Sequence, residues 1–228
     1  LLPGPSYDVA VIGLGAMGSA ALAHLAARGK RVIGIEQFQP GHDRGSSAGE
    51  SRAIRLGYFE HPSYVPLVRR AYENWRALEG RTGETVLVTT GIIEAGHAEG
   101  MLVAGSLKAC MLHGIEHELL DPAEVRRRFP AFQLPAHYRA MWQPQGGIVR
   151  ADTANALHLS LARADGAEIA AGTKVLAIEP QAGSVRIVCE GRTIQAGSVV
   201  VCAGPWTMEL VPELRRVLSL SRLVLTWY

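Results

Sequence analysis

The fold of this chain is decided by the stretch YDVAVIGLGAMG, residues 7–18. Its first half, residues 7–12, is a short apolar run that leads into glycine, which predicts a buried strand. Apolar side chains then recur at helical spacing over residues 16–28, and Gly29 ends this helix. A second apolar run, residues 31–36, predicts another strand. Strand, helix and strand together form a βαβ unit, the building block of a parallel sheet.

Three glycines of this stretch, Gly13, Gly15 and Gly18, fit the pattern G-x-G-x-x-G. The pattern alone is weak, but here it follows a strand and opens a helix, which is the context of a dinucleotide site. Gly13 allows a tight turn, Gly15 lets a pyrophosphate approach the backbone, and Gly18 lets the helix pack closely on the strand. Free N–H groups at the helix start favour phosphate. The alternative is a glycine-rich turn that binds nothing.

Glu36 ends the second predicted strand, 23 positions after Gly13. An acid at this place can accept hydrogen bonds from ribose hydroxyls. A carboxylate would also repel a 2′-phosphate, which disfavours NADP. The alternative is an exposed surface glutamate.

The choice between NAD and FAD depends on the part of the chain after the second strand. Residues 12–18 also resemble NAD(P)-dependent hydroxyacid dehydrogenases, but those families continue through further βαβ units. This chain instead gives a polar loop with a short helix over residues 37–61. It returns to an apolar strand only at residues 198–204. A late apolar strand ending in Ala-Gly is typical of FAD-binding domains, so we expect FAD.

The rest of the chain predicts a helix from Tyr64 to Leu78 and an alternation of short strands and helices after it. Further helices are expected at residues 99–113, 122–128 and 153–164, the last with Asp152 as N-cap. Strands are expected at residues 86–88, 91–94, 174–179, 184–189 and 192–195. Residues 222–228 are strand-like and stop abruptly, so we expect the chain to be the N-terminal part of a longer protein.

These elements predict an α/β fold. We expect a Rossmann-like FAD-binding domain with an interrupted parallel sheet, plus part of a second, antiparallel-sheet substrate domain. The FAD-binding domain is assigned to residues 1–85 and 145–221. The partial substrate domain is assigned to residues 86–144 and 222–228, because their short strands lack a βαβ rhythm.

Composition narrows the class of protein. Of the 228 residues, 48% are hydrophobic and 19% are charged, as in ordinary globular proteins. The formal net charge of +2 argues against a surface that binds nucleic acid. No apolar run approaches the ~18 residues of a membrane span. Three scattered cysteines and no signal-peptide pattern favour a reducing compartment, which we take to be the cytoplasm. The histidine spacing predicts no metal site.

The chain resembles the FAD-dependent amine oxidoreductases of the monomeric sarcosine oxidase and N-methyltryptophan oxidase group, within the D-amino-acid-oxidase-like superfamily. The resemblance covers essentially all 228 residues and rests on four strings. They are residues 7–18 with Glu36, the string GSSAGESRAIR at residues 45–55, the string YVPL at residues 64–67 with Trp75, and the string CAGPW at residues 202–206. The second string is far more specific than the first.

The resemblance also implies differences from the family. Its members are considerably longer, and their C-terminal part carries the cysteine that binds flavin covalently and the lysine that activates oxygen. Within the second string, Ala48 stands where the family usually has His. If that His tunes the flavin, reactivity here differs.

Two arginines of the second string, Arg52 and Arg55, are the expected catalytic residues. Being three apart, they would share a face if this segment formed a helical turn. A guanidinium can stabilise negative charge on a reduced flavin or clamp a carboxylate in bidentate fashion. The resemblance implies that Arg55 holds the substrate carboxylate and that Arg52 sits against the flavin. The alternative is solvated surface charge.

The expected cofactor contacts lie in the glycine stretch, at the end of the second strand, in the second string and near the later strands. They are Gly13, Gly15, Ala16, Met17, Gly18, Glu36, Gln37, Ser46, Ser51, Arg52, Val175, Ala203, Gly204 and Trp206. Trp206 either lines the flavin site or packs beneath it.

The resemblance implies oxidation of a secondary or N-methylated amino acid to an imine. A hydride passes to the flavin, water hydrolyses the imine, and oxygen reoxidises the flavin and gives hydrogen peroxide. The partner is then a small amino acid or amine, with no nucleic acid and no membrane. Two alternatives stay open: an NAD-dependent hydroxyacid-type dehydrogenase, and a non-catalytic FAD-binding fragment or subunit.

Overall fold

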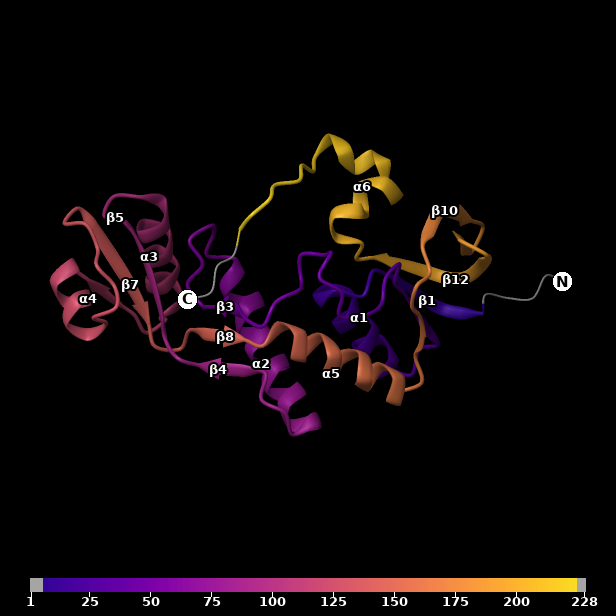
Figure 1. Cartoon of the computed structure of the whole chain (residues 1–228), viewed down its shortest axis with the longest axis horizontal. Coiled ribbons are helices and arrows are strands. Elements are labelled where there is room, and N and C mark those ends of the chain that lie inside the picture. Colours follow the sequence, from indigo (N-terminus) through magenta and orange to yellow (C-terminus); the bar gives the residue numbers. More distant parts are fainter. Residues whose placement is uncertain (1–5, 225–228) are drawn as a thin grey trace. The chain divides into compact units, whose positions relative to one another are not determined.

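The structure is a computed structural model that describes residues 6–224 of the chain (Figure 1). The described residues form two compact units. The first unit holds the residues up to Gly49 together with those from Ala151 onward, and the second unit is Glu50–Arg150. Within residues 6–224, no helix combines the length and the apolar character that a membrane crossing requires.

The first unit is built on a six-stranded sheet with the order β10-β11-β12-β1-β2-β9. The strands are β1 (Tyr7–Ile12), β2 (Val32–Ile35), β9 (Glu168–Ala170), β10 (Val175–Gln181), β11 (Ser184–Cys189) and β12 (Arg192–Val201). The four strands β12, β1, β2 and β9 run parallel, whereas β10 and β11 form an antiparallel extension of β12. The late strand therefore lies directly beside β1, and the expected interrupted parallel sheet is confirmed.

Two helices, α1 (Ala16–Ala26) and α5 (Ala151–Ala164), pack on each other and on this sheet. Successive strand residues point to opposite faces, so each strand contributes to two cores. Val11 joins Leu22 and Leu159 in the core beneath the helices. Ile12 and Ile187 belong to the core on the other face. After β12 the chain forms short turns of helix: η1 (Gly204–Trp206), α6 (Thr207–Leu210) and η2 (Pro212–Arg216).

The second unit contains two small antiparallel sheets. One has the order β3-β8-β4, from Arg52–Ile54, Gly147–Val149 and Leu87–Thr89. The other has the order β5-β7-β6, from Ile92–His97, Tyr138–Gln143 and Glu118–Leu120. Antiparallel pairing over residues 86–144 is therefore confirmed.

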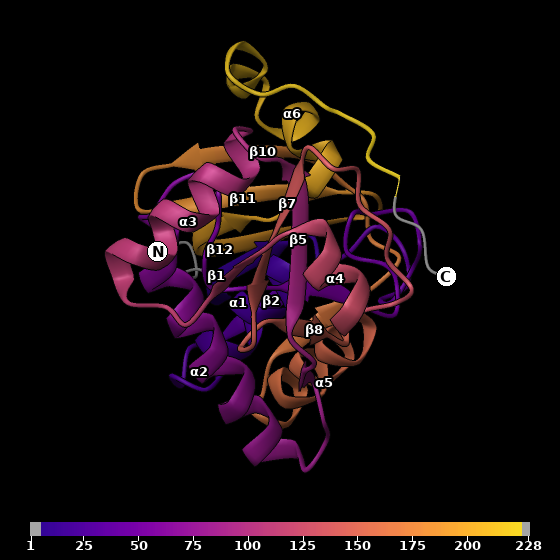
Figure 2. The same cartoon turned by 90° about the vertical axis from the view of Figure 1, so that its left-hand side faces the viewer.

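Three helices complete the second unit: α2 (Tyr64–Thr82), α3 (Met101–His113) and α4 (Pro122–Arg128). Figure 2 shows α3 and α4 on either side of β5 and β7. Met141 packs with Val103 of α3, whereas its neighbour Ala140 packs with Val125 of α4. Because successive side chains of β7 point to opposite faces of the sheet, α3 packs on one face and α4 on the other.

Several local expectations were wrong. Residues 37–61 contain no helix; they contain β3, because Arg52 and Ala53 pair with Val149 and Ile148 of β8. The strands expected at residues 192–195 and 198–204 form the single strand β12, which ends at Val201. Strands β6, β7, β8 and β9 were not predicted, because each is held by pairing with a strand distant in the sequence.

Two further expectations concern a helix start and the last residues. Helix α5 begins at Ala151, so Asp152 is not its N-cap; its Oδ1 instead accepts a hydrogen bond from Gly49 N, 3.1 Å away. Residues 222–224 form no strand, and the rest of the expected strand, residues 225–228, lies outside the described residues.

The boundaries of the two compact units differ from those of the two domains expected from the sequence. Residues 50–85 pack within the second unit. The reason is that β3 pairs with β8 and that α2 contacts β4, which also pairs with β8. The division into a flavin domain and a substrate domain stays a prediction.

Candidate functional site

The turn between β1 and α1 is shaped by two of its glycines. Gly13 has φ +88°, a conformation that L side chains rarely adopt. A Cβ on Gly13 would lie 2.4 Å from the carbonyl oxygen of Cys202, and one on Gly18 would lie 1.7 Å from the carbonyl oxygen of Gly13. Both glycines are therefore required by the close approach of strand, turn and helix, whatever the turn binds.

Gly15 stands at the start of α1 and faces a serine. It is the N-cap residue, with no side-chain cap, and a Cβ there would lie 2.8 Å from Ser47 Oγ. The same Oγ accepts a hydrogen bond from Ala16 N at 2.9 Å. Met17 follows and is 78% exposed. The sequence singled out Ser46, which is exposed here, and missed Ser47, since no local signal tells which of two adjacent serines faces the helix.

Glu36 lies against this turn. Its carboxylate accepts hydrogen bonds from Leu14 N (2.8 Å) and Phe38 N (3.1 Å), and His42 Nε2 lies 3.4 Å from Oε1. The residue is only 5% exposed, so it is no surface glutamate. A carboxylate offers about four lone-pair sites, and this one has acceptor capacity left for hydroxyl groups.

The remaining predicted contacts of the first unit gather near Glu36. Because β12, β1 and β2 are parallel, their ends meet at one edge of the sheet, which brings Ala203 and Gly204 beside the glycine turn. The ring of Trp206 packs edge-on against Phe38, with centroids 5.7 Å apart. Half-buried Gln37 follows Glu36 directly.

Val175 is tied to the same place through the backbone. The N–H of Thr173 donates to the carbonyl oxygen of Glu36 at 2.9 Å, and Val175 then begins β10. The Val175 side chain is buried in the core cluster that includes Ile35. Only its backbone is therefore available to a ligand.

Ser51, Arg52 and Arg55 belong to the second unit. Arg52 lies in β3, and its Nη1 donates to the carbonyl oxygen of the half-buried Ser51 at 2.8 Å. Since the segment is extended, the expectation that Arg52 and Arg55 share a helical face is wrong. Pairing of β3 with β8 overrode the helical spacing.

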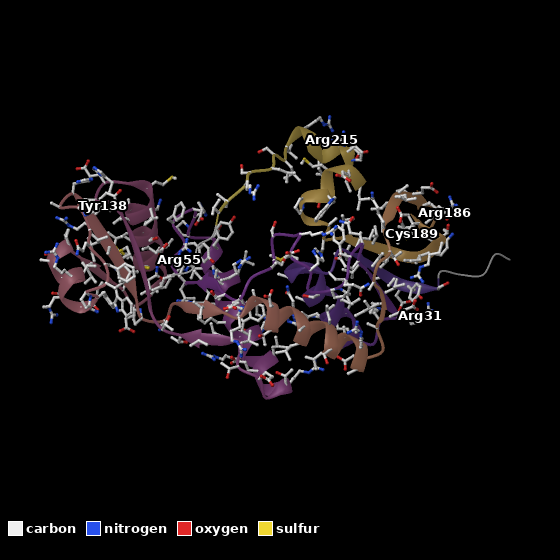
Figure 3. All side chains as sticks on the ribbon, in the orientation of Figure 1. Arg31, Arg55, Tyr138, Arg186, Cys189 and Arg215 are labelled. Atoms are coloured by element: carbon white, nitrogen blue, oxygen red, sulfur yellow. The ribbon has the colours of Figure 1, made fainter. Side chains whose placement is uncertain are left out.

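Arg55 forms a close ion pair with Glu94 of β5. Arg55 Nε and Glu94 Oε1 are 2.5 Å apart, and the two side chains are only 16% and 7% exposed. The Nε–H makes no hydrogen bond, so the contact is ionic rather than directional. The guanidinium also lies over the ring of Tyr58, 4.3 Å from its centroid, with Phe59 at 5.9 Å. Figure 3 labels Arg55 within the second unit.

Glu94 is itself held by further polar groups. Its Oε2 accepts hydrogen bonds from Gln143 Nε2 (2.8 Å) and Ser106 Oγ (3.4 Å). Gln143 Oε1 in turn accepts from Gly57 N at 2.8 Å. Burial raises the pKa of the Glu94 carboxyl, and the charge of Arg55 opposes that shift. Neither Glu94 nor Gln143 was among the predicted site residues; the acid that closes the apolar run 91–94 was the only local signal for this pair.

A cavity of about 470 Å³ also lies within the second unit. Its lining includes Leu56, Tyr72 and Gln145. The Tyr72 hydroxyl donates to the carbonyl oxygen of Gln145 at 2.8 Å, and burial raises the Tyr72 pKa to about 12. None of the predicted site residues lines this cavity.

Comparison with known proteins gives one family. Residues 8–226 match the model of the DAO family, described as FAD dependent oxidoreductase. The chain is 42% identical over 224 residues to monomeric sarcosine oxidase of Streptomyces avermitilis, covering 98% of this chain and 58% of that protein. It is 33% identical over 222 residues to N-methyl-L-tryptophan oxidase of Yersinia pestis, covering 97% and 59%.

A solved structure shares the fold. NikD, an unusual amino acid oxidase essential for nikkomycin biosynthesis, superposes with a TM-score of 0.83 at 30% identity. The match covers 91% of this chain and 54% of NikD. The chain thus spans a little over half the length of the relatives it matches.

Proposed function

Because the chain belongs to the FAD-dependent oxidoreductase family, we propose that the whole protein oxidises the carbon–nitrogen bond of a small secondary or N-methylated amino acid. The observation that carries the proposal is the Arg55 guanidinium, which lies over the rings of Tyr58 and Phe59. The same chain also has the glycine turn and Glu36 beside it. The names of the relatives, sarcosine oxidase and N-methyl-L-tryptophan oxidase, support this substrate class.

The glycine turn and Glu36 of the first unit fit an FAD, and Ser51 and Arg52 of the second unit are proposed to add to its site. The turn has no Cβ at Gly15, where the backbone would approach a pyrophosphate. The N–H groups at the start of α1 would favour its charge. Glu36 would accept hydrogen bonds from ribose hydroxyls. Gln37, Ser46, Ser51, Val175, Ala203, Gly204 and Trp206 are proposed as further contacts, and Arg52 as the group beside the flavin ring.

In this proposal Arg55 binds the substrate carboxylate through two parallel hydrogen bonds and so fixes the amine carbon. The neutral amine form of the substrate would lose a hydride, which is two electrons and one proton, and become a protonated imine, which water hydrolyses. Bound FAD supplies the electron acceptor for this step, and oxygen, reduced to hydrogen peroxide, is the expected final acceptor.

The NAD-dependent alternative has lost its support. A dehydrogenase of that type continues its sheet with βαβ units, whereas β10 and β11 extend this sheet in antiparallel fashion. We further propose the cytoplasm as compartment, which the three scattered cysteines support.

The proposal is tested on the whole purified protein. Its visible spectrum should show oxidised flavin, and sarcosine or N-methyltryptophan added without oxygen should bleach it. Admission of oxygen should restore the spectrum and release hydrogen peroxide. A flavin spectrum that no secondary amino acid bleaches would leave a flavin-binding protein without this activity, and a protein without flavin would contradict the proposal altogether.

A further inference from the structure

The Arg55–Glu94 ion pair places a buried negative charge beside the arginine proposed to bind the substrate carboxylate. Glu94 lies on β5 with 7% of its side chain exposed. Nothing in the proposed reaction requires it. A group that lies this close to the clamp must alter how strongly the clamp attracts a second carboxylate.

Glu94 is fixed in its position. Gln143 of β7 and Ser106 of α3 both donate to its Oε2. Gln143 is itself tied to the backbone of Gly57. Because these partners come from elements packed on β5, the carboxylate cannot swing away when a ligand approaches Arg55.

Arg55 has a second support that does not depend on Glu94. Its guanidinium stacks on Tyr58, 4.3 Å from the ring centroid, and such a contact holds a cation without neutralising it. Glu94 approaches the Nε side of the guanidinium. Among the described residues, Nη1 and Nη2 of Arg55 donate no hydrogen bond, and 16% of the side chain is exposed, so we assign this edge as the fork that would meet a carboxylate.

We propose that Glu94 is a specificity-determining residue: a permanent counter-ion that weakens the hold of Arg55 on a substrate carboxylate. The inference rests on the proposed function. An incoming carboxylate meets a pair whose formal charges cancel, so it gains the short hydrogen bonds to Arg55 but also feels repulsion from Glu94. The site therefore discriminates less sharply between amino acids and amines that lack a carboxylate than an unpaired arginine would.

The test measures binding of acetate, and of its uncharged analogue acetamide, to the whole flavin-loaded protein by isothermal titration calorimetry. Glu94→Gln should tighten acetate binding about tenfold, because an effective dielectric of about 20 leaves a strong repulsion at this range. Acetamide binding should not change. The matched control is Glu118→Gln, which removes an exposed acid paired with Arg128 in the same sheet and should leave both constants unchanged.

A second variant, Glu94→Met, keeps the test decisive if Glu94→Gln does not fold. In Glu94→Gln the new side-chain NH2 group can face the Nε2 amide group of Gln143, which places two donors against each other. Glu94→Met removes the charge without adding a donor. Thermal unfolding identifies which variant is folded, and that variant should show the tighter acetate binding. Acetate bound equally well or more weakly by the folded charge-free variants would overturn the inference.

Arg55→Met separates this result from a failure of the proposed function. If acetate binding is unchanged in Arg55→Met, then Arg55 is not a carboxylate clamp and the proposed function loses its main support. If Arg55→Met abolishes acetate binding while the Glu94 variants bind as the unmodified protein does, only the role of Glu94 is wrong.

Discussion

The hydroxyl of Ser47 accepts a hydrogen bond from the backbone N–H of Ala16, with 2.9 Å between nitrogen and oxygen. A loop residue thereby satisfies one of the free N–H groups at the start of α1. The same hydroxyl lies 2.8 Å from the place that a Cβ on Gly15 would take. Loop and helix start are therefore fitted to each other at the proposed pyrophosphate position.

Ser47→Ala should lower the free energy of unfolding by about 1 kcal/mol, because the Ala16 N–H loses its partner. Urea titration measures the change. Ser198→Ala, at an exposed serine of β12, should stay within about 0.5 kcal/mol of the unmodified protein. Equal stability of the two variants would mean that the hydrogen bond to Ala16 contributes nothing.

Gly15→Val should abolish FAD binding while α1 persists. A branched Cβ would displace Ser47 and occupy the space where the backbone meets the pyrophosphate. FAD content of the purified variant and its far-ultraviolet circular dichroism measure the two effects. Gly80→Ala is the control, since a Cβ at this position of α2 meets nothing within 4 Å. Undiminished FAD in Gly15→Val would refute the assignment.

Glu36→Gln should weaken both FAD binding and the fold. The amide oxygen can accept a hydrogen bond from the N–H of either Leu14 or Phe38, but the amide NH2 then faces the other N–H. This loss costs about 1–3 kcal/mol. Glu36→Arg should be more severe, because it removes the acceptor entirely. FAD retention on dialysis and urea unfolding give the readouts, with Glu179→Gln, at a half-exposed acid paired with Arg186, as control. Full retention of FAD would show that Glu36 does not bind the ribose.

Arg55→Lys should raise KM for amino acid substrates roughly ten- to hundred-fold, since a point charge cannot make two parallel hydrogen bonds. Dimethylamine, which is sarcosine without its carboxylate, should be affected much less. The measurement is kcat/KM for both compounds in both proteins. Equal losses on the two would assign Arg55 to the flavin or to the fold instead.

The stability of the first unit should fall in acid through His158 of α5. Burial, and then the charge of His24, lower the His158 pKa to about 4 from 6.5. The unfolded chain binds the proton more readily, so stability is complete above pH 6.5 and is lost as pH falls toward 4. The loss between pH 7 and about pH 4.5 should be roughly 2–3 kcal/mol.

Urea unfolding at the two pH values measures this loss, and His158→Leu should reduce it. The same substitution at the exposed His61 is the control, and it should leave the loss of stability between the two pH values unchanged. The same acid sensitivity in His158→Leu would show that other groups cause it.

Local sequence patterns were enough to predict the βαβ unit, the glycine turn and the apolar end of β12. Each of these follows from a local pattern: alternating or helical periodicity, glycines at fixed spacing, and an apolar run that leads into Ala-Gly. Gly13 needs its positive φ within its own turn, so the signal and the structure lie in the same few residues. The family resemblance rested on strings of the same local kind.

The path of residues 45–57 and their contacts depend on tertiary packing and could not be predicted from local patterns. The loop expected to hold a short helix holds strand β3 instead, because β8 supplies hydrogen-bond partners that no local propensity reveals. Ser47 rather than Ser46 reaches Ala16, and Glu94 rather than solvent faces Arg55. Such contacts join residues far apart in the chain, and their free energy depends on burial and on pairing geometry, which exist only once the strands are assembled.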